Sequence, residues 1–250
     1  KRDAGSASLS PSVGERPAVG GPSPVVRLAA VPALRILSDD PLRHPALIGY
    51  LVSRGIIPSV AAAFCREVRY EVNGRAFFVG FRNDAGGWEL RSERFKGGSS
   101  PKHITTLDNR SDTVIAFEGF MDFLAYLSLK YPERLRIDAA VLNSVVNLPK
   151  AVPFISRHPV IHAFFDNDEA GRKTTSDLIR LCPRSEVIDQ RHFYSGHKDV
   201  NDYLIARIKD RPKTTKTISD KQDHSCRNDL QPSKAETATI EPPRRKGVKI

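Results

Sequence analysis

The chain has 250 residues, of which 40% are apolar, enough for one domain of ordinary size with smaller or unstructured parts beside it. Its formal net charge of +10 favours a polyanionic partner such as a nucleic acid, because a Lys or Arg placed on a phosphate releases a counterion. Three cysteines without CxxC spacing argue against a disulfide framework or a zinc site, and no apolar run has the length of a membrane span. We therefore expect a cytoplasmic protein that does not associate with membranes.

The two ends of the chain differ in composition from its middle. Residues 1–40 are rich in Ala, Gly, Ser and Pro without sustained periodicity, which predicts a disordered arm or linker. Residues 211–250 contain ten Lys or Arg and five Asp or Glu, so they supply +5 of the net charge. Because they lack an apolar stripe, we predict a basic disordered tail.

Residues 41–110 predict a small α+β module. An apolar stripe in residues 44–54, closed by Gly55, is typical of a helix, and a second short helix is expected after Pro58. The Asn73-Gly74 pair separates two strand-like runs, and Asn-Gly supplies the positive φ angles of a type I′ hairpin turn. A third strand is expected at residues 88–91, followed by a flexible loop at residues 97–101.

From residue 111 to residue 210, strand-length apolar runs alternate with amphipathic helices. This order predicts an α/β fold with a mostly parallel, Rossmann-like sheet and helices on both faces. Ligands of such sheets bind beyond the carboxyl ends of the strands. The expected strands lie at residues 113–117, 139–145, 160–165 and 185–190, and the expected helices at residues 120–131, 150–156, 170–181 and 199–210.

Acidic residues follow two of these strands. Glu118 comes directly after the first strand, and Asp166 and Asp168 come after the third, so all three are expected at one edge of the sheet. Clustered carboxylates repel one another and usually require a cation, and Mg²⁺ prefers such hard oxygen ligands. The segment at residues 198–202, KDVND, opens the last helix and is expected to complete the site.

Three other interpretations of the acidic residues remain open. Asp168 is also suited to cap the helix that follows it. The string at residues 166–171 is similar to the first half of an EF-hand loop with Asp177 at its twelfth position, although an apolar strand precedes it instead of a helix. A phosphatase of the haloacid dehalogenase type also places Asp-x-Asp after a strand, but normally after the first strand, where this chain has Glu118.

Three motifs, in order, resemble a known family. Residues 117–122 (FEGFMD) resemble the EGYMD motif of bacterial DnaG-type primases, and residues 165–171 (FDNDEAG) resemble their DxDxAG motif. Residues 198–202 (KDVND) are similar to their KDPDE-like segment. The preceding strings at residues 51–55, 67–70, 86–91 and 95–97 resemble primase-like proteins of mobile elements from Bacteroides-type bacteria.

The resemblance covers about residues 45–210 and implies a Toprim fold that binds Mg²⁺ or Mn²⁺. It implies that Glu118, Asp166 and Asp168 are catalytic, with Asp122 in a supporting role on the first helical turn. Template or triphosphate contacts are expected from four basic residues, two of which flank the expected loop. The implied metal ligands are Glu118, Asp166, Asp168, Asp199, Asn201 and Asp202, and the implied phosphate contacts are Arg91, Lys96, Lys102 and Lys198.

The chain departs from the family in two respects. These primases usually begin with a zinc-binding domain, and no Cys/His cluster in this sequence is suited to form one. In the third motif Asn201 stands where the primase pattern usually has a second Asp. An amide carbonyl is able to coordinate a metal but lacks the charge, which puts the metal affinity and the ligand set in question.

Three functional classes follow. The first is a primase-like nucleotidyltransferase that makes short RNA on single-stranded DNA from nucleoside triphosphates, in mobile-element or plasmid replication, with a replicative helicase as an open partner. The second is a Toprim nuclease, since a topoisomerase needs a tyrosine nucleophile in an additional domain. The third is a catalytically weak single-strand-binding module of a replication or transfer complex.

Overall fold

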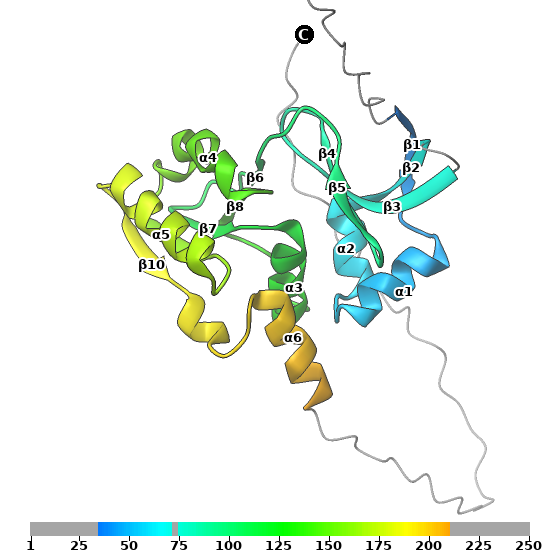
Figure 1. Cartoon of the computed structure of the whole chain (residues 1–250). Coiled ribbons are helices and arrows are strands. Elements are labelled where there is room, and N and C mark those ends of the chain that lie inside the picture. Colours follow the sequence, from blue (N-terminus) through cyan, green and yellow to red (C-terminus); the bar gives the residue numbers. More distant parts are fainter. Residues whose placement is uncertain (1–34, 72–74, 211–250) are drawn as a thin grey trace, which may run out of the picture. The chain divides into compact units, whose positions relative to one another are not determined.

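A computed structural model describes residues 35–71 and 75–210, which form two five-stranded sheets with six α-helices (Figure 1). The predicted disordered tail, most of the predicted arm and the Asn73-Gly74 turn lie outside the described residues. These three expectations therefore remain predictions.

The first sheet is antiparallel throughout, with strand order β1-β2-β3-β4-β5. The two faces of β2 pack on different cores, because Val68 and Tyr70 belong to one buried cluster and Cys65, on the opposite face, belongs to another. The strands expected on either side of Asn73-Gly74 pair with each other, as the hairpin prediction requires. The strands are β1 (Arg35–Pro41), β2 (Cys65–Glu71), β3 (Arg75–Arg82), β4 (Trp88–Ser92) and β5 (Phe95–Gly98).

Two strands of this sheet differ from the sequence expectation. β1 lies partly inside residues 1–40, because its pairing with β2 supplies the order that its polar sequence does not predict. The expected loop at residues 97–101 begins later, because Gly97 and Gly98 belong to β5. A Cβ on Gly98 would lie 2.4 Å from the Trp88 carbonyl oxygen, so glycine is needed for this close strand pairing.

Two short helices connect β1 to β2, namely α1 (Pro45–Ser53) and α2 (Pro58–Phe64). Each has proline in its first turn, where the missing N–H costs no hydrogen bond. Gly55, with a φ of 73°, follows the end of α1 in the left-handed region that glycine adopts readily. Both helices confirm the sequence prediction.

The second sheet has the order β10-β9-β7-β8-β6, with parallel pairs except for β6, which runs antiparallel to β8. The predicted mostly parallel α/β fold is confirmed. Its strands are β6 (Thr105–Leu107), β7 (Thr113–Phe117), β8 (Asp138–Val141), β9 (Val160–Phe164) and β10 (Glu186–Asp189). Its helices are α3 (Phe120–Lys130), α4 (Leu148–Ile155), α5 (Glu169–Leu181) and α6 (Val200–Lys209), with short 3-10 turns at Val145–Asn147 and Arg191–Tyr194.

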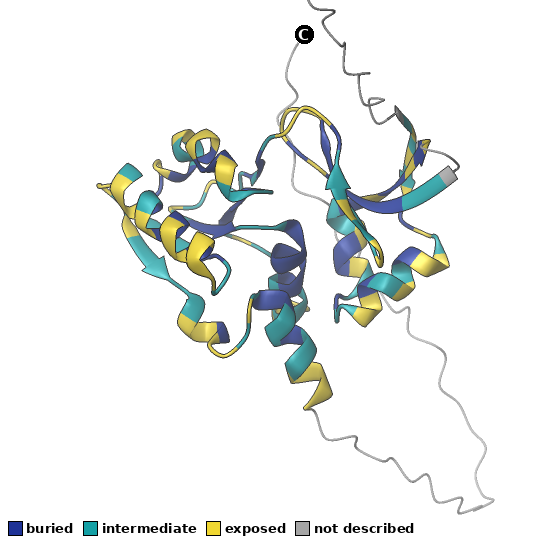
Figure 2. Cartoon of the chain, viewed as in Figure 1, coloured by how far each residue is buried: buried dark blue, intermediate teal, exposed yellow. Residues whose placement is uncertain are grey.

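Alternation along β7 divides its side chains between two layers. Ile115 and Phe117 belong to a core cluster that includes α3, whereas Val114 and Ala116 belong to one that includes α4 and α5. Figure 2 shows β7 and most of α3 as buried, while α5 exposes one face. Helices therefore cover both faces of the sheet, as its apolar strands require.

One continuous core joins the two sheets. Phe81 of β3 stacks on Phe120 of α3 at 5.1 Å between ring centroids, and both are fully buried. The Ile57 N–H, just before α2, also donates to the Ser128 hydroxyl of α3 at 3.1 Å. The small module therefore packs directly on the helix that follows Glu118.

Among the residues with a described structure, no single helix is long and apolar enough to cross a membrane. Helices α1 and α2 pass that test together by length and composition alone, with a bend of 113° between them.

Candidate metal centre

Two acidic residues follow the carboxyl ends of the neighbouring parallel strands β7 and β9, so they lie at the same edge of the sheet. Phe117 of β7 is in register with Phe164 of β9, and Glu118 and Asp166 follow shortly after these residues. The Asp166 N–H donates to the Glu118 carboxylate, while Glu118 Oε2 is buried without a hydrogen-bond partner. A buried, unsatisfied carboxylate oxygen is rare in proteins and commonly marks a place where a ligand or an ion binds.

The pKa of the Glu118 carboxyl group is raised strongly by its surroundings. Burial, followed by the nearby carboxylates of Asp166 and Asp168, raises its pKa to about 7 against the opposing effects of the Asp166 N–H and Lys198. Glu118 is therefore able to hold or release a proton near neutral pH.

The raised pKa of Glu118 predicts that the metal-free protein loses stability as the pH rises. Between the ordinary glutamate pKa of 4.5 and about 7, the unfolded chain has released this proton while the folded protein still holds it, which favours unfolding. The loss is on the order of 2 kcal/mol after allowance for solvent screening, and it is complete above about pH 7. In urea titrations with a chelator, we expect the parent to lose more stability than Glu118→Gln between about pH 5 and about pH 8. Equal losses in the two proteins would contradict this assignment.

Asp122, the predicted supporting residue, belongs to the same acidic group. It lies in the first turn of α3 and is buried, and burial followed by Asp199, Asp166 and Glu118 raises its pKa well above the usual range. Its Oδ1 accepts a hydrogen bond from the Asn201 N–H at 3.2 Å. The one-turn spacing from Glu118 therefore brings it to the cluster.

Asp166 also has a raised pKa, because of burial and the neighbouring Asp199, although Lys198 opposes the shift. The Lys198 Nζ lies 3.4 Å from Asp166 Oδ2. Since the Lys198 side chain is 61% exposed, this ion pair is screened by solvent and only weakly compensates the carboxylates. The cluster thus retains excess negative charge.

Asn167, between the two aspartates, connects two loops of the site. Its N–H donates to the Lys198 carbonyl at 2.7 Å, and its side-chain amide donates to the carbonyls of His197 at 2.8 Å and Tyr194 at 3.3 Å. The Tyr194 hydroxyl in turn donates to the Phe165 carbonyl at 2.7 Å. These bonds hold the segment around Asp166 against the segment before Asp199. Asn167 is not among the predicted site residues, although its position between two site aspartates is visible in the sequence.

Asp168 and Asp199 each cap a helix with one carboxylate oxygen. Asp168 Oδ1 accepts from the Gly171 N–H at 2.8 Å, so the capping interpretation is confirmed, and Asp199 Oδ1 accepts from the Asp202 N–H at 2.7 Å. The EF-hand interpretation is wrong, because Asp177 lies within α5 and pairs with Lys173 and Arg180. In both caps Oδ2 has no hydrogen bond recorded within residues 35–71 and 75–210.

The acidic cluster forms one wall of a cavity of about 550 Å³. Basic residues from the small module form another part of the lining, so opposite charges face the same space. Of the predicted residues, the lining includes Arg91, Lys96, Glu118, Asp122, Asp166, Lys198, Asp199 and Asn201. The lining also includes residues that were not predicted to belong to the site, among them Tyr50, Arg54, Arg94, Asn143 and Ser144.

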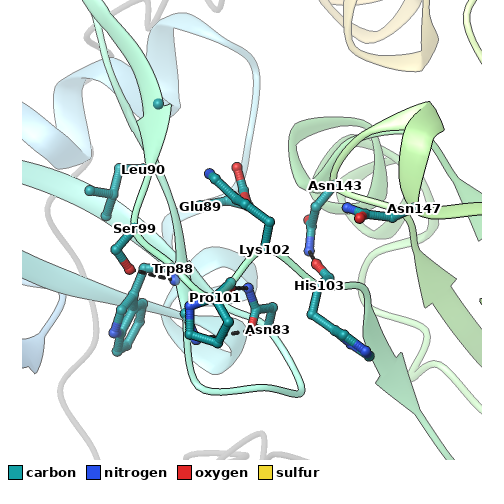
Figure 3. Close-up of polar contacts among 12 residues, drawn as sticks. Asn83, Trp88, Glu89, Leu90, Ser99, Pro101, Lys102, His103, Asn143 and Asn147 are labelled. Atoms are coloured by element: carbon teal, nitrogen blue, oxygen red, sulfur yellow. Dashed lines mark hydrogen bonds and ion pairs between the residues drawn. The ribbon is translucent and has the colours of Figure 1, made fainter. Parts of the chain in front are cut away.

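Four predicted residues have other surroundings or partners. Asp168 is not among the residues that line the cavity, although it lies close enough to Glu118 to raise the pKa of that residue. Lys102 does not line the cavity, since its Nζ binds buried Glu89 at 3.1 Å (Figure 3). Asp202 also lies outside the lining and contributes its N–H to the cap on Asp199. Asn201 lines the cavity, but Arg54 occupies both polar atoms of its side chain, at 2.6 Å and 2.7 Å. Metal coordination through this carbonyl stays a prediction, and it would compete with the Arg54 contact for the same oxygen.

Two lining residues owe their positions to the backbone. Arg91 lies over the Phe120 ring at 5.4 Å and donates to the Leu90 and Gly97 carbonyls at 2.9 Å and 3.4 Å. Asn143, beyond the end of β8, has a φ of 62° and donates to the His103 carbonyl at 3.0 Å (Figure 3). Its own Oδ1 is buried without a partner. Asparagine tolerates this left-handed conformation better than most residues do.

The donor atoms of this edge suit a hard divalent cation. In the part of the chain with described positions, no group of three His, Cys, Asp or Glu side chains is already arranged to hold a metal. Mg²⁺, however, is usually held by one or two carboxylates and retains several waters. Glu118 Oε2 has no hydrogen-bond partner, and the raised pKa values of Glu118, Asp122 and Asp166 show that the metal-free site disfavours their ionised forms. A bound cation would remove this penalty, so these residues fit such an ion.

In comparisons with known proteins, two segments of the chain match two different protein families. Residues 115–204 match a protein family described as Toprim-like, which confirms the predicted Toprim resemblance and fold, and residues 36–100 match a domain of unknown function (DUF8464). Similar solved structures include the primase fragment of the bacteriophage T7 primase-helicase protein, with 16% identity, a TM-score of 0.49, and coverage of 63% of this chain and 69% of that one. The zinc-binding and RNA polymerase domains of the Aquifex aeolicus primase show 16% identity, a TM-score of 0.46 and coverage of 60% and 50%. No curated protein matches the chain in sequence.

Proposed function

We propose that this chain, which contains a Toprim-like domain at residues 115–204, is a metal-dependent primase-like nucleotidyltransferase. Its reaction would join nucleoside triphosphates into short RNA primers on a single-stranded DNA template: the 3′-hydroxyl attacks the α-phosphate of the incoming triphosphate, and pyrophosphate leaves. The observation that carries the proposal is the cavity itself, where the uncompensated carboxylates of Glu118, Asp122 and Asp166 face the guanidinium groups of Arg54 and Arg91.

Each side of the cavity suits one part of this chemistry. The basic side, formed by Arg54, Arg91 and Lys96, is suited to bind the phosphates of a triphosphate or a template strand. Glu118, Asp166 and Asp199 on the acidic side, together with the nearby Asp168, would hold Mg²⁺ or Mn²⁺. When bound, such an ion supplies positive charge that stabilises the developing negative charge of phosphoryl transfer.

Glu118 has a second possible task in this reaction, at its unpartnered Oε2. A carboxyl group with a pKa of about 7 is matched to proton transfer at neutral pH, since both of its forms are populated there. We propose that Glu118 Oε2 receives the proton of the attacking hydroxyl. Asp122, whose Oδ1 accepts from the Asn201 N–H, is held in a fixed place beside Glu118.

The biological setting belongs to the proposal as well. Single-stranded DNA and nucleoside triphosphates are its substrates, a replicative helicase is an open partner, and replication of a mobile element or plasmid in the cytoplasm is the expected context. The resemblance of residues 117–122, 165–171 and 198–202 to primase motifs supports this setting.

A primer-synthesis assay tests the proposed function. The full chain is incubated with single-stranded DNA, four nucleoside triphosphates, one of them labelled, and Mg²⁺ or Mn²⁺. We expect short RNA products that depend on template and metal and that disappear with a chelator. Shortening of the DNA in the absence of triphosphates would instead identify a nuclease. Retention of the strand without product or cleavage would identify a binding module.

A further inference from the structure

Asn201 is almost completely buried, at 1% exposure, and joins three elements that are distant in sequence. It lies in the first turn of α6, its N–H contacts Asp122 of α3, and its side chain contacts Arg54 at the end of α1. All three residues line the cavity. Asn201 is therefore placed where it affects both the acidic and the basic side.

The contact between Asn201 and Arg54 is reciprocal. The Arg54 Nε donates to Asn201 Oδ1 at 2.6 Å, and the Asn201 side-chain amide donates to the Arg54 carbonyl at 2.7 Å. Only a side chain with an adjacent acceptor and donor makes both bonds, and at this size asparagine is that side chain. These bonds fix the direction of the guanidinium group as well as the backbone that carries it.

The backbone around Arg54 is also packed tightly against α6. A Cβ on Gly55 would lie 2.7 Å from Ile208 Cδ1 and 3.1 Å from Leu204 Cγ. The end of α1 therefore has little freedom to move on α6. Within the described residues, no hydrogen bond is recorded for the two terminal nitrogens of Arg54, and the residue lines the cavity.

The charge of the partner matters for what Arg54 is able to bind. An aspartate at position 201 would form an ion pair with the guanidinium and compensate its charge, whereas the asparagine amide leaves the full positive charge toward the cavity. The departure from the usual primase pattern at Asn201 therefore has a structural explanation in the contact with Arg54.

We propose that Asn201 is a positioning residue and not a metal ligand, and that its neutral amide directs the Arg54 guanidinium toward a nucleotide phosphate. This inference rests on the proposed function, because it takes a nucleoside triphosphate as the ligand. Asn201 acts through Arg54 and has no direct contact with the reacting atoms.

A double-mutant cycle on ligand binding tests the proposal. The affinity for GTP in the presence of Mg²⁺ is measured by calorimetry for the parent, Asn201→Ala, Arg54→Ala and the double variant. We expect each single change to weaken binding about tenfold, as the loss of one charge-assisted hydrogen bond does, and the double variant to resemble Arg54→Ala. Independent effects that multiply in the double variant would overturn the proposal.

A second measurement separates positioning from metal ligation. Mn²⁺ is titrated without nucleotide and followed by its paramagnetic resonance signal. We expect Asn201→Ala to bind Mn²⁺ about as tightly as the parent, whereas a tenfold loss, on the order of one lost ligand, would overturn the proposal. Asn201→Asp provides a variant of the same shape, in which GTP binding is expected to weaken while Mn²⁺ binding does not.

Asn109→Ala serves as the matched control. The Asn109 amide also donates to a main-chain carbonyl, that of Ile137 at 2.8 Å, but this residue does not line the cavity. We expect it to leave GTP and Mn²⁺ binding unchanged. If the parent binds no GTP, the proposed function fails. The contact between Arg54 and Asn201 is then tested by itself, by measuring the free energy of unfolding in urea for the same four proteins. Coupling between Arg54 and Asn201 would support it, and additivity would overturn it.

Discussion

Replacing Asp166 with asparagine is expected to lower primer synthesis by about a thousandfold or more while making the metal-free protein more stable. The activity falls because the amide removes a charge from the proposed metal ligands, and several kcal/mol of charge stabilisation correspond to such a factor. Stability rises because burial and Asp199 already raise the Asp166 pKa, so the folded state disfavours the charged form. Primer synthesis and urea unfolding with a chelator, both above neutral pH, measure the two effects.

Asp112→Asn is the control for this change, because Asp112 is exposed and precedes β7 at the opposite end of the strand from Glu118. It is expected to alter neither property. Synthesis by Asp166→Asn at the parent's rate would remove the acidic cluster from the mechanism. A large loss of stability would show instead that Asp166 has a structural role that its raised pKa does not indicate.

Gly171→Ala is expected to damage the site through the backbone. A Cβ at this position would lie 2.0 Å from the Asp166 carbonyl oxygen and 2.9 Å from its carbonyl carbon, so either α5 or Asp166 must move. Overpacking of this kind costs about 1–3 kcal/mol, against which the better helix propensity of alanine offsets up to about 1 kcal/mol. Because a displacement near 1 Å costs about a hundredfold in rate, we expect at least that loss of synthesis.

Gly49→Ala is the matched control, since Gly49 lies in α1 and a Cβ there meets no atom within 4 Å. It is expected to preserve activity and to leave the protein as stable or slightly more stable. Thermal unfolding and primer synthesis of both variants are compared under the same conditions. Full activity in Gly171→Ala would contradict the close packing of α5 on Asp166.

The helices and the parallel strands were predictable because their sequences contain the signal that determines them. Buried parallel strands such as β7 and β9 are continuous apolar runs, and the helices between them are amphipathic. β1 and β5 contain no such signal, because β1 is largely polar and β5 is half glycine. Their order comes from pairing with β2 and β4, which a local pattern does not reveal.

The same distinction applies to the candidate site. Glu118 and Asp166 were predictable because each follows a recognisable strand, and parallel strands bring their carboxyl ends together. The partners of Lys102 and Asn201 were not predictable, because both partners lie in other parts of the chain. Glu89 lies 13 residues from Lys102, and Arg54 lies 147 residues from Asn201. Spacing within a motif predicts which side chains share an edge, but it does not predict which distant side chain occupies their hydrogen-bonding groups.

The stacking of Phe81 on Phe120 has a consequence for how this protein is recombined with others. A boundary drawn between the two sheets would expose an aromatic surface on each half and would separate the cationic lining of the cavity from the anionic lining. We therefore expect a chimera to need residues 35–210 as one piece. We also expect a change in the size of either aromatic ring to require a compensating change in the other, because the two rings are packed against each other in the core.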